Sequence, residues 1–123
     1  MSIELNQLEV KFFTMLKTCT SCRVAIKIVK ELQERHNLEI VHQDLLCMNE
    51  EEANKTRVIW GTPWPIRHTP DLWGTIDELQ AKYGMLSTPV IIIHNKLIPL
   101  QGFKFHDESN LKHEIEKGLG TNA

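Results

Sequence analysis

The sequence lacks the long apolar segments and the basic leader that membrane and exported proteins carry. Its first ten residues contain neither the basic n-region nor the apolar h-region of a secretory signal. No apolar run approaches the roughly 20 residues that are needed to span a bilayer. We therefore expect a cytoplasmic protein that has no membrane partner.

A concentration of positive charge is also missing. The 14 Lys and Arg residues and the 16 Asp and Glu residues are scattered along the chain, and the formal net charge is −2. A protein that follows a phosphate backbone carries a basic patch or stripe on one face. The charge pattern therefore argues against nucleic acid as a partner.

Cysteine is scarce, with three residues in a chain of 123. Three cysteines are too few for a scaffold stapled by disulfides, and two of them, Cys19 and Cys22, stand in the sequence Cys-Thr-Ser-Cys. In a reducing compartment this spacing favours redox or metal chemistry over a structural bridge.

The length and the apolar content of 41% suit a single domain, residues 1–123, without internal repeats. Apolar residues recur at one-turn spacing after Cys22, as in an amphipathic helix, and residues 90–93 form an apolar run typical of a buried strand. Strands are expected at residues 8–14, 38–46, 89–94 and 97–100, and helices at 22–36, 49–60, 75–84 and near 109–118. This order predicts an α/β fold with a central mixed sheet of about four strands flanked by helices.

The position of the cysteine pair is informative. Cys19 falls between the first strand and the first helix, where unpaired N–H groups and the helix dipole stabilise a thiolate. Cys22 lies one turn further on and shares the apolar stripe of Ala25 and Val29, so it should be more buried. This asymmetry predicts that Cys19 attacks a disulfide and that Cys22 resolves the mixed disulfide.

Two other interpretations of the pair remain open from the residues alone. Cysteines at a helix start can be small core residues, since free cysteine is commonly buried. A Cys-x-x-Cys pair can also be half of a zinc site, although no second pair appears at a suitable spacing. Convergence of His42, His68 and Cys47 would be the remaining route to a thiolate metal site.

A second motif lies downstream, at residues 83–93, which read Tyr-Gly-Met-Leu-Ser-Thr-Pro-Val-Ile-Ile-Ile. Together with Phe12-Phe13 before the cysteines and Gly102 after the expected hairpin, it resembles the thioredoxin and glutaredoxin superfamily. The resemblance covers most of the chain outside residues 47–74, which look like an insertion or an enlarged connection before the proline.

The resemblance implies a thioredoxin-like fold in which the Thr88–Pro89 peptide bond is cis and packs beside the cysteines. Thr88 and Pro89, together with Thr20 and Ser21, would then contact the substrate, and the Thr88 backbone would pair with an extended chain that carries the disulfide. The implied activity is thiol–disulfide oxidoreduction by the Cys19 and Cys22 couple, without a cofactor or a metal. The partners would be a disulfide-containing protein or small molecule and an unidentified electron donor.

Some family features differ here. The dipeptide Thr20-Ser21 is neither the Gly-Pro of thioredoxins nor the Pro-Tyr of glutaredoxins, which leaves the direction of electron flow open. Only Gln101-Gly102 and Asp107 partly match the glutathione-binding residues, so glutathione dependence is not supported. A non-catalytic binding or redox-sensing module and a thiolate metal-binding protein are the alternative functions.

Four kinds of residue could add to the site. The tryptophans at positions 60, 64 and 73 are expected to cover an enlarged core, with an aromatic surface for a protein partner as the alternative. Cys47 is expected to be a buried thiol at a strand end. His94 is expected to be a hydrogen-bonded structural residue within its strand. Lys17 is a candidate to stabilise the Cys19 thiolate, although an exposed lysine contributes little when solvent screens its charge.

Overall fold

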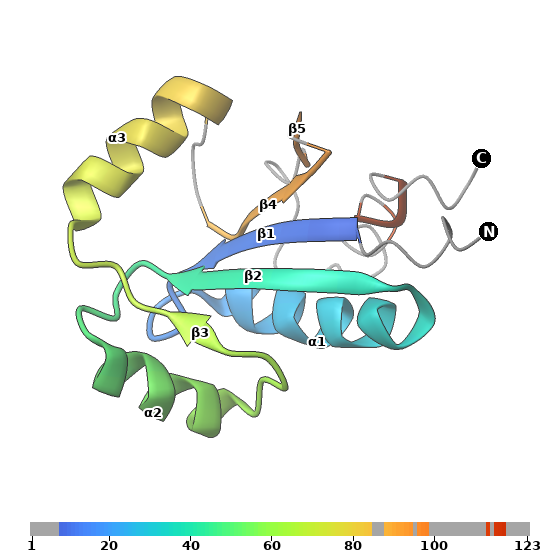
Figure 1. The fold of residues 1–123 in the computed structure, drawn as a ribbon, viewed down its shortest axis with the longest axis horizontal. Helices are drawn as coiled ribbons and strands as arrows, with labels where there is room; N and C mark the ends of the chain where they lie inside the picture. Colours follow the sequence, from blue (N-terminus) through green and yellow to red (C-terminus); the bar gives the residue numbers. More distant parts are fainter. Residues whose placement is uncertain (1–7, 85–87, 95, 99–112, 114, 118–123) are drawn as a thin grey trace.

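The computed structural model describes residues 8–84, 88–94, 96–98, 113 and 115–117 (Figure 1). Its strands and helices alternate along the first two thirds of the chain. In chain order they are β1 (Leu8–Thr14), α1 (Thr20–Arg35), β2 (Leu38–Asp44), α2 (Glu50–Trp60), β3 (Ile66–Arg67), α3 (Leu72–Tyr83), β4 (Val90–Ile93) and β5 (Lys96–Leu97).

The strands form one mixed sheet in the order β3-β2-β1-β4-β5. Strands β1, β2 and β3 run parallel, whereas β4 runs antiparallel to β1 and to β5. The carboxyl ends of β1, β2 and β3 therefore meet the amino end of β4 at one edge, on the left of Figure 1. The predicted α/β fold with a mixed sheet is confirmed.

The sheet has five strands where the sequence predicts about four. The additional strand, β3, has two residues and pairs with His42 and Gln43 of β2. It lies within residues 47–74, which the sequence predicts to be an insertion or an enlarged connection. A strand this short has no periodic pattern, so only its long-range pairing reveals it.

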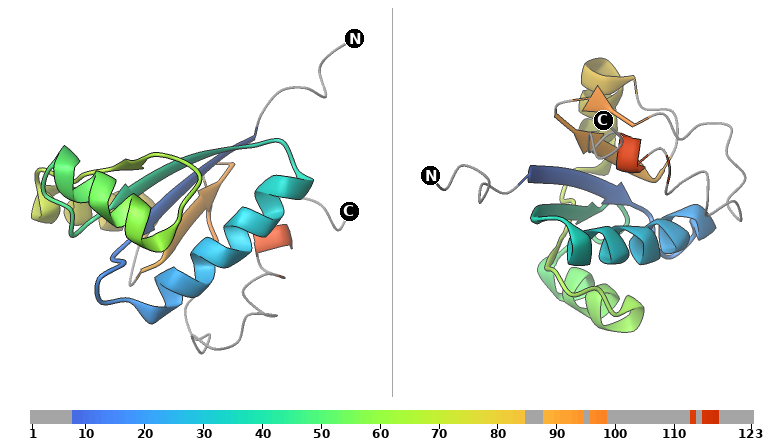
Figure 2. Two further views of the ribbon diagram at one scale, coloured as in Figure 1. Left: turned by 90° about the horizontal axis from the view of Figure 1, so that it is seen from below. Right: turned by 90° about the vertical axis from the view of Figure 1, so that its right-hand side faces the viewer.

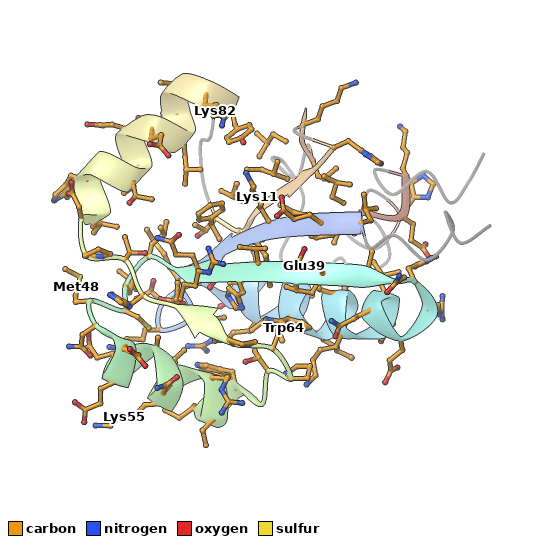
Figure 3. The ribbon with its side chains drawn as sticks, in the orientation of Figure 1. Lys11, Glu39, Met48, Lys55, Trp64 and Lys82 are labelled. Atoms are coloured by element: carbon orange, nitrogen blue, oxygen red, sulfur yellow. The ribbon has the colours of Figure 1, made fainter. Side chains whose placement is uncertain are left out.

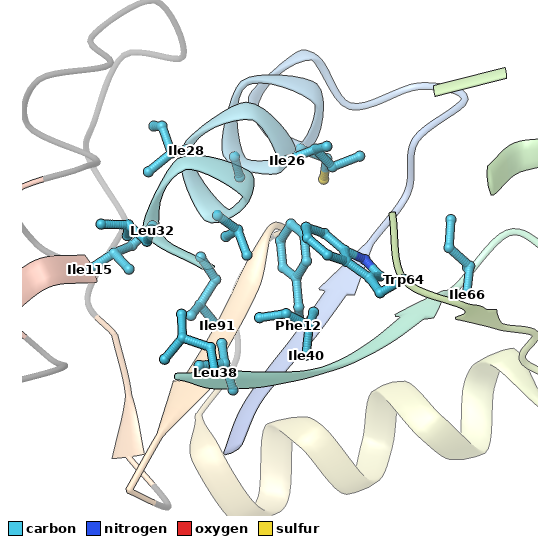
Figure 4. Packing of buried hydrophobic residues seen from close by; sticks show 14 of the residues in the cluster. Phe12, Ile26, Ile28, Leu32, Leu38, Ile40, Trp64, Ile66, Ile91 and Ile115 are labelled. Atoms are coloured by element: carbon cyan, nitrogen blue, oxygen red, sulfur yellow. The ribbon is translucent and has the colours of Figure 1, made fainter. Parts of the chain in front are cut away.

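Side chains that alternate along β1 and β4 supply two separate apolar layers. Phe12 and Ile91 face α1 and join the larger core cluster (Figure 4), on the face of the sheet that α1 covers in Figure 2. Phe13 and Ile92 point to the opposite face and pack with Leu79 of α3. Successive strand residues face opposite sides, which explains why β4 is apolar throughout.

The helix starts follow local capping. Asn49 accepts from the Glu52 N–H at 2.9 Å, and Glu52 Oε1 in turn accepts from the Met48 N–H at 2.8 Å. Helix α3 begins three residues before the predicted Thr75, because the Asp71 side chain accepts from Gly74 N–H at 3.1 Å and caps it there. Helix α1 likewise begins at Thr20, two residues before Cys22.

The end of the sheet departs from the prediction at His94. This residue lies exposed in the turn between β4 and β5 with φ of 56°, so the expected structural role within the strand is wrong. Ile115, in the helical residues near the C-terminus, is buried in the larger core cluster. Gln101, Gly102 and Asp107 lie outside the described residues.

Among the residues that the structure describes, no helix combines the length and the apolarity needed to cross a membrane.

Candidate active site

Cys19 occupies the N-cap position of α1, at the sheet edge where β1 ends. Its extended backbone, with φ of −106° and ψ of 107°, brings Sγ to 3.1 Å from the Cys22 N–H, which donates to it. A sulfur in this position satisfies an N–H group that would otherwise lack a partner in the helix. Cys19 is partly exposed, whereas the Cys22 side chain is 0% exposed within the core cluster.

The pKa of Cys19 is lowered to about 6, chiefly by a hydrogen bond from the Cys22 side chain. The Thr88 side chain and the N–H groups of Cys22 and Ser21 act in the same direction, whereas partial burial opposes them. A pKa near 6 leaves Cys19 mostly ionised at neutral pH, which is the form that attacks disulfides.

The two cysteines titrate in opposite directions. Burial raises the pKa of Cys22, and its neighbour Cys19 raises it further. The Met15 N–H, which lies 3.5 Å from Cys22 Sγ, acts in the opposite sense by favouring the ionised sulfur. Cys22 therefore keeps its proton while Cys19 is ionised.

Thr88 lies at the site, as expected. Its carbonyl oxygen is 3.6 Å from Cys19 Sγ and accepts from the thiol when that is protonated, and the Thr88–Pro89 peptide bond is cis. Thr20 is exposed and Ser21 is half-buried in the first turn of α1. The site thus has one reactive sulfur, an adjacent backbone carbonyl and an open first turn.

Lys17 pairs with a carboxylate of α2. Its Nζ lies 3.9 Å from Glu52 Oε2, so its charge is directed toward α2. Both side chains are well exposed, and solvent weakens such a pair.

Two of the three residues proposed for a metal site, His42 and Cys47, have other partners. His42 is buried, with Nε2 at 2.7 Å from Thr14 Oγ1 and Nδ1 accepting from Trp64 Nε1 at 2.9 Å. The Cys47 thiol is buried and lies 3.3 Å from Thr56 Oγ1, and burial raises its pKa. Within the described part of the chain, no three His, Cys, Asp or Glu residues are grouped so that they could hold a metal ion.

The tryptophans have three different environments. Trp64 is 4% exposed and points inward beside β2, whereas Lys55 on α2 points away from the sheet (Figure 3). Trp60 is half-buried beneath the Arg23 guanidinium, whose carbon lies 4.3 Å from the ring centre. Trp73 is 73% exposed at the start of α3. The prediction of core tryptophans therefore holds for Trp64 and is wrong for Trp73.

Sequence reasoning missed two charged residues that hold the loop before Cys19. Arg23 donates to the carbonyl groups of Leu16 and Lys17, and Asp44 accepts from Leu16 N–H. The sequence contains a signal for Asp44. It continues the inward-facing alternation of Leu38, Ile40 and His42 along β2, where a charged residue is unusual and requires partners.

No protein-family model matches the sequence, and no curated protein matches it significantly. Solved structures resemble it at low identity. A Chlorobium tepidum protein assigned as the thiol:disulfide interchange protein DsbE is 17% identical with a TM-score of 0.62, over 97% of this chain and 84% of that chain.

Two further structures are similar. One is the thioredoxin domain of the thiol-disulfide oxidoreductase BVU-2223 of Bacteroides vulgatus, which is 18% identical with a TM-score of 0.56, over 90% of this chain and 78% of that one. The other is a thiol:disulfide interchange protein of the thioredoxin family from Chlorobium tepidum TLS, 14% identical with a TM-score of 0.56, over 97% and 85%. The chain therefore has a thioredoxin-like fold.

Proposed function

We propose that the protein is a thiol–disulfide oxidoreductase in which Cys19 is the nucleophile and Cys22 the resolving thiol. One observation carries the proposal: an accessible thiol whose pKa is about 6 lies beside a buried thiol whose pKa is raised. Such a pair separates the attacking sulfur from the resolving sulfur. The solved structures of similar fold, which are described as thiol-disulfide oxidoreductases or interchange proteins, support this function.

The reaction is two successive thiol–disulfide exchanges. The Cys19 thiolate attacks one sulfur of a substrate disulfide, the S–S bond breaks, and the departing thiolate takes up a proton. Cys22 then loses its proton and attacks Cys19 Sγ, which releases the second substrate thiolate and forms the Cys19–Cys22 disulfide. The substrate gains two electrons and two protons, and an electron donor of the dithiol class returns the pair to its reduced form.

The surroundings of Cys19 favour a disulfide carried on an extended polypeptide. The Thr88 carbonyl lies 3.6 Å from Cys19 Sγ, and an extended chain that pairs with the Thr88 backbone would present its sulfur to Cys19. Thr20 is exposed beside the nucleophile and Pro89 is buried, so Thr20 would touch the substrate while Pro89 shapes the wall behind Thr88. A small-molecule disulfide would contact only Cys19 Sγ and the exposed first turn of α1, without pairing to the Thr88 backbone.

Turnover of a disulfide-linked model peptide, with a chemical dithiol as the electron donor, tests the proposal. Cys19→Ser should lose at least about 100-fold in rate, because the remaining thiols are buried and mostly protonated. With the dithiol donor left out, Cys22→Ser should accumulate a mixed disulfide on Cys19, which mass spectrometry detects. Cys47→Ser is the matched control and should keep the wild-type rate. Equal turnover by wild type and Cys19→Ser would sink the proposal.

A redox-sensing binding module is the second candidate, and the exposed Trp73 at the same edge of the sheet favours it. The same assay separates the two functions. A sensor would form the Cys19–Cys22 disulfide once per oxidation and would not turn over with the dithiol donor.

A further inference from the structure

One residue of the loop between β1 and α1, Met15, contacts both Cys19 and Cys22 through its backbone. The Met15 carbonyl accepts from the N–H groups of Thr18 and Cys19, at 3.1 Å and 2.9 Å, and so forms the turn that delivers Cys19 to the N-cap. The Met15 N–H lies 3.5 Å from Cys22 Sγ. Any displacement of Met15 therefore moves backbone groups that contact both Cys19 and Cys22.

The backbone of the next residue, Leu16, forms hydrogen bonds to two side chains of opposite charge. Its N–H donates to Asp44 Oδ2 at 2.9 Å, and its carbonyl accepts from Arg23 Nε at 2.9 Å. Arg23 also donates through Nη2 to the Lys17 carbonyl at 3.0 Å. Hydrogen bonds to ionised groups are roughly twice as strong as neutral ones, so these contacts hold the backbone firmly.

Asp44 is itself held by a chain of buried donors. Trp64 Nε1 can only donate, so His42 Nδ1 must accept from it and His42 Nε2 must carry the proton that it gives to Thr14 Oγ1. The Thr14 hydroxyl then donates to Asp44 Oδ2 at 2.9 Å, while Asp44 Oδ1 accepts from the Leu46 N–H. Each donor in the chain has one acceptor, which leaves a single arrangement of hydrogens.

The Arg23 side chain is held in place by a second tryptophan, Trp60. Its guanidinium stacks over Trp60, at 4.3 Å from the ring centre, while its N–H groups reach the loop carbonyls. Trp60 and Trp64 both belong to residues 47–74, which join β2 to the helix before Thr88. Two separate connections from this segment therefore converge on Leu16.

We propose that Asp44 and Arg23 are positioning residues for the thiol pair, and that Trp64 and Trp60 support them through His42 and Thr14 and by stacking. The inference rests on the proposed function and assigns residues 47–74 a task within it: they hold the loop that sets the geometry of the two sulfurs. These residues act through the Leu16 backbone and do not touch the reacting atoms.

Loss of the hydrogen bonds from Asp44 and Arg23 to the loop should lower the rate of the resolving step. Attack of Cys22 on Cys19 Sγ is intramolecular and depends on alignment, and a displacement of about 1 Å can slow such a step by about 100-fold. The first attack depends on the partly exposed Cys19, to which N–H groups of α1 itself donate. We expect resolution to slow by about ten-fold to 100-fold and the first attack to change by less than about three-fold.

Stopped-flow measurement of both steps with the disulfide-linked model peptide tests the inference in Arg23→Gln, Asp44→Ala and Trp60→Leu. Arg23→Lys should recover part of the resolution rate, because an ammonium group can still reach one loop carbonyl. Two variants serve as controls. Arg35→Gln removes a cation at the far end of α1, where it lies 3.8 Å from Glu116 Oε2, and Glu39→Ala removes an exposed acidic residue of β2. Both controls should resolve at the wild-type rate.

The outcomes separate the two claims. If Arg23→Gln and Asp44→Ala remain folded and resolve as fast as Arg35→Gln and Glu39→Ala, or if both steps fall by the same factor, the positioning role is overturned. If Asp44→Ala does not fold, the partly exposed Arg23 and Trp60 decide the question. If the wild-type protein attacks the peptide but never forms the Cys19–Cys22 disulfide, the proposed function fails, and the inference fails with it.

Discussion

Replacement of Cys22 by Ala should raise the pKa of Cys19. The hydrogen bond from the Cys22 side chain is the largest cause that lowers this pKa to about 6. A hydrogen bond to a charged group contributes about 1.5–3 kcal/mol, and one pKa unit corresponds to about 1.4 kcal/mol. Because solvent screens the partly exposed sulfur, the lower end applies. We expect a rise of about one unit, to a pKa near 7.

The pH profile is more informative here than the rate at pH 7. At a pKa of about 6, roughly 90% of Cys19 is ionised at pH 7, whereas roughly 1% of a thiol with the ordinary pKa of 9.0 would be. Intrinsic nucleophilicity rises with the pKa, with a Brønsted coefficient of about 0.45, so the one-unit rise in Cys22→Ala increases it about three-fold, while the ionised fraction at pH 7 falls from roughly 90% to roughly 50%. These effects nearly cancel at pH 7. At pH 5.5 the Cys22→Ala variant should react about three-fold more slowly than the wild type.

Alkylation by iodoacetamide between pH 4 and pH 10, followed by mass spectrometry, measures the midpoint. In Cys22→Ala the other thiol, Cys47, is fully buried, so the fast phase reports Cys19. Cys22→Ser is the matched control, because its hydroxyl can replace the donor and should keep the midpoint near 6. A midpoint that stays near 6 in Cys22→Ala would refute the reasoning and assign the low pKa to the N–H groups of α1.

Two further predictions concern stability. Burial lowers the pKa of His42 to about 3, so between about pH 6.5 and pH 3 the unfolded chain binds a proton that the folded protein does not, and stability is lost as pH falls through that window. The loss from pH 7 to pH 5 should be about 2 kcal/mol in denaturant unfolding, and His42→Gln should remove that part of the slope; an unchanged slope would contradict it. Gly84 ends α3 with φ of 68° and has open space around the position of a side chain, so Gly84→Ala should cost about 1 kcal/mol through backbone strain alone. Ser21→Ala in the first turn of α1 serves as its thermal-unfolding reference, and equal melting temperatures would count against the strain argument.

Local patterns were sufficient for much of the fold. The one-turn apolar spacing after Cys22 predicts α1, and the strand expected at residues 38–46 and the helix expected at residues 49–60 correspond to β2 and α2. These signals lie within a few residues of the structure they specify. Helix α3 began earlier than expected because Asp71, rather than Thr75, supplies the cap.

Long-range contacts were beyond such patterns. Strand β3 is defined by its pairing with His42 and Gln43 of β2. Trp64 is buried and Trp73 is exposed because only Trp64 packs against the sheet. Neither feature has a local periodicity. The relay from Trp64 to Asp44 joins residues that are far apart in sequence, so their partnership cannot be inferred from spacing.

Cys-Thr-Ser-Cys at a strand-to-helix junction was enough to predict which sulfur is exposed and which is buried, because both follow from helix geometry close to the motif. Tertiary structure alone decided what surrounds the pair. It brings the Thr88 carbonyl to Cys19 and sets Asp44 and Arg23 on either side of the Leu16 peptide. The physical reason is that hydrogen bonds and charge pairs act over a few ångströms in space, and the folding of β1, β2 and β4 into one sheet brings these groups within that range.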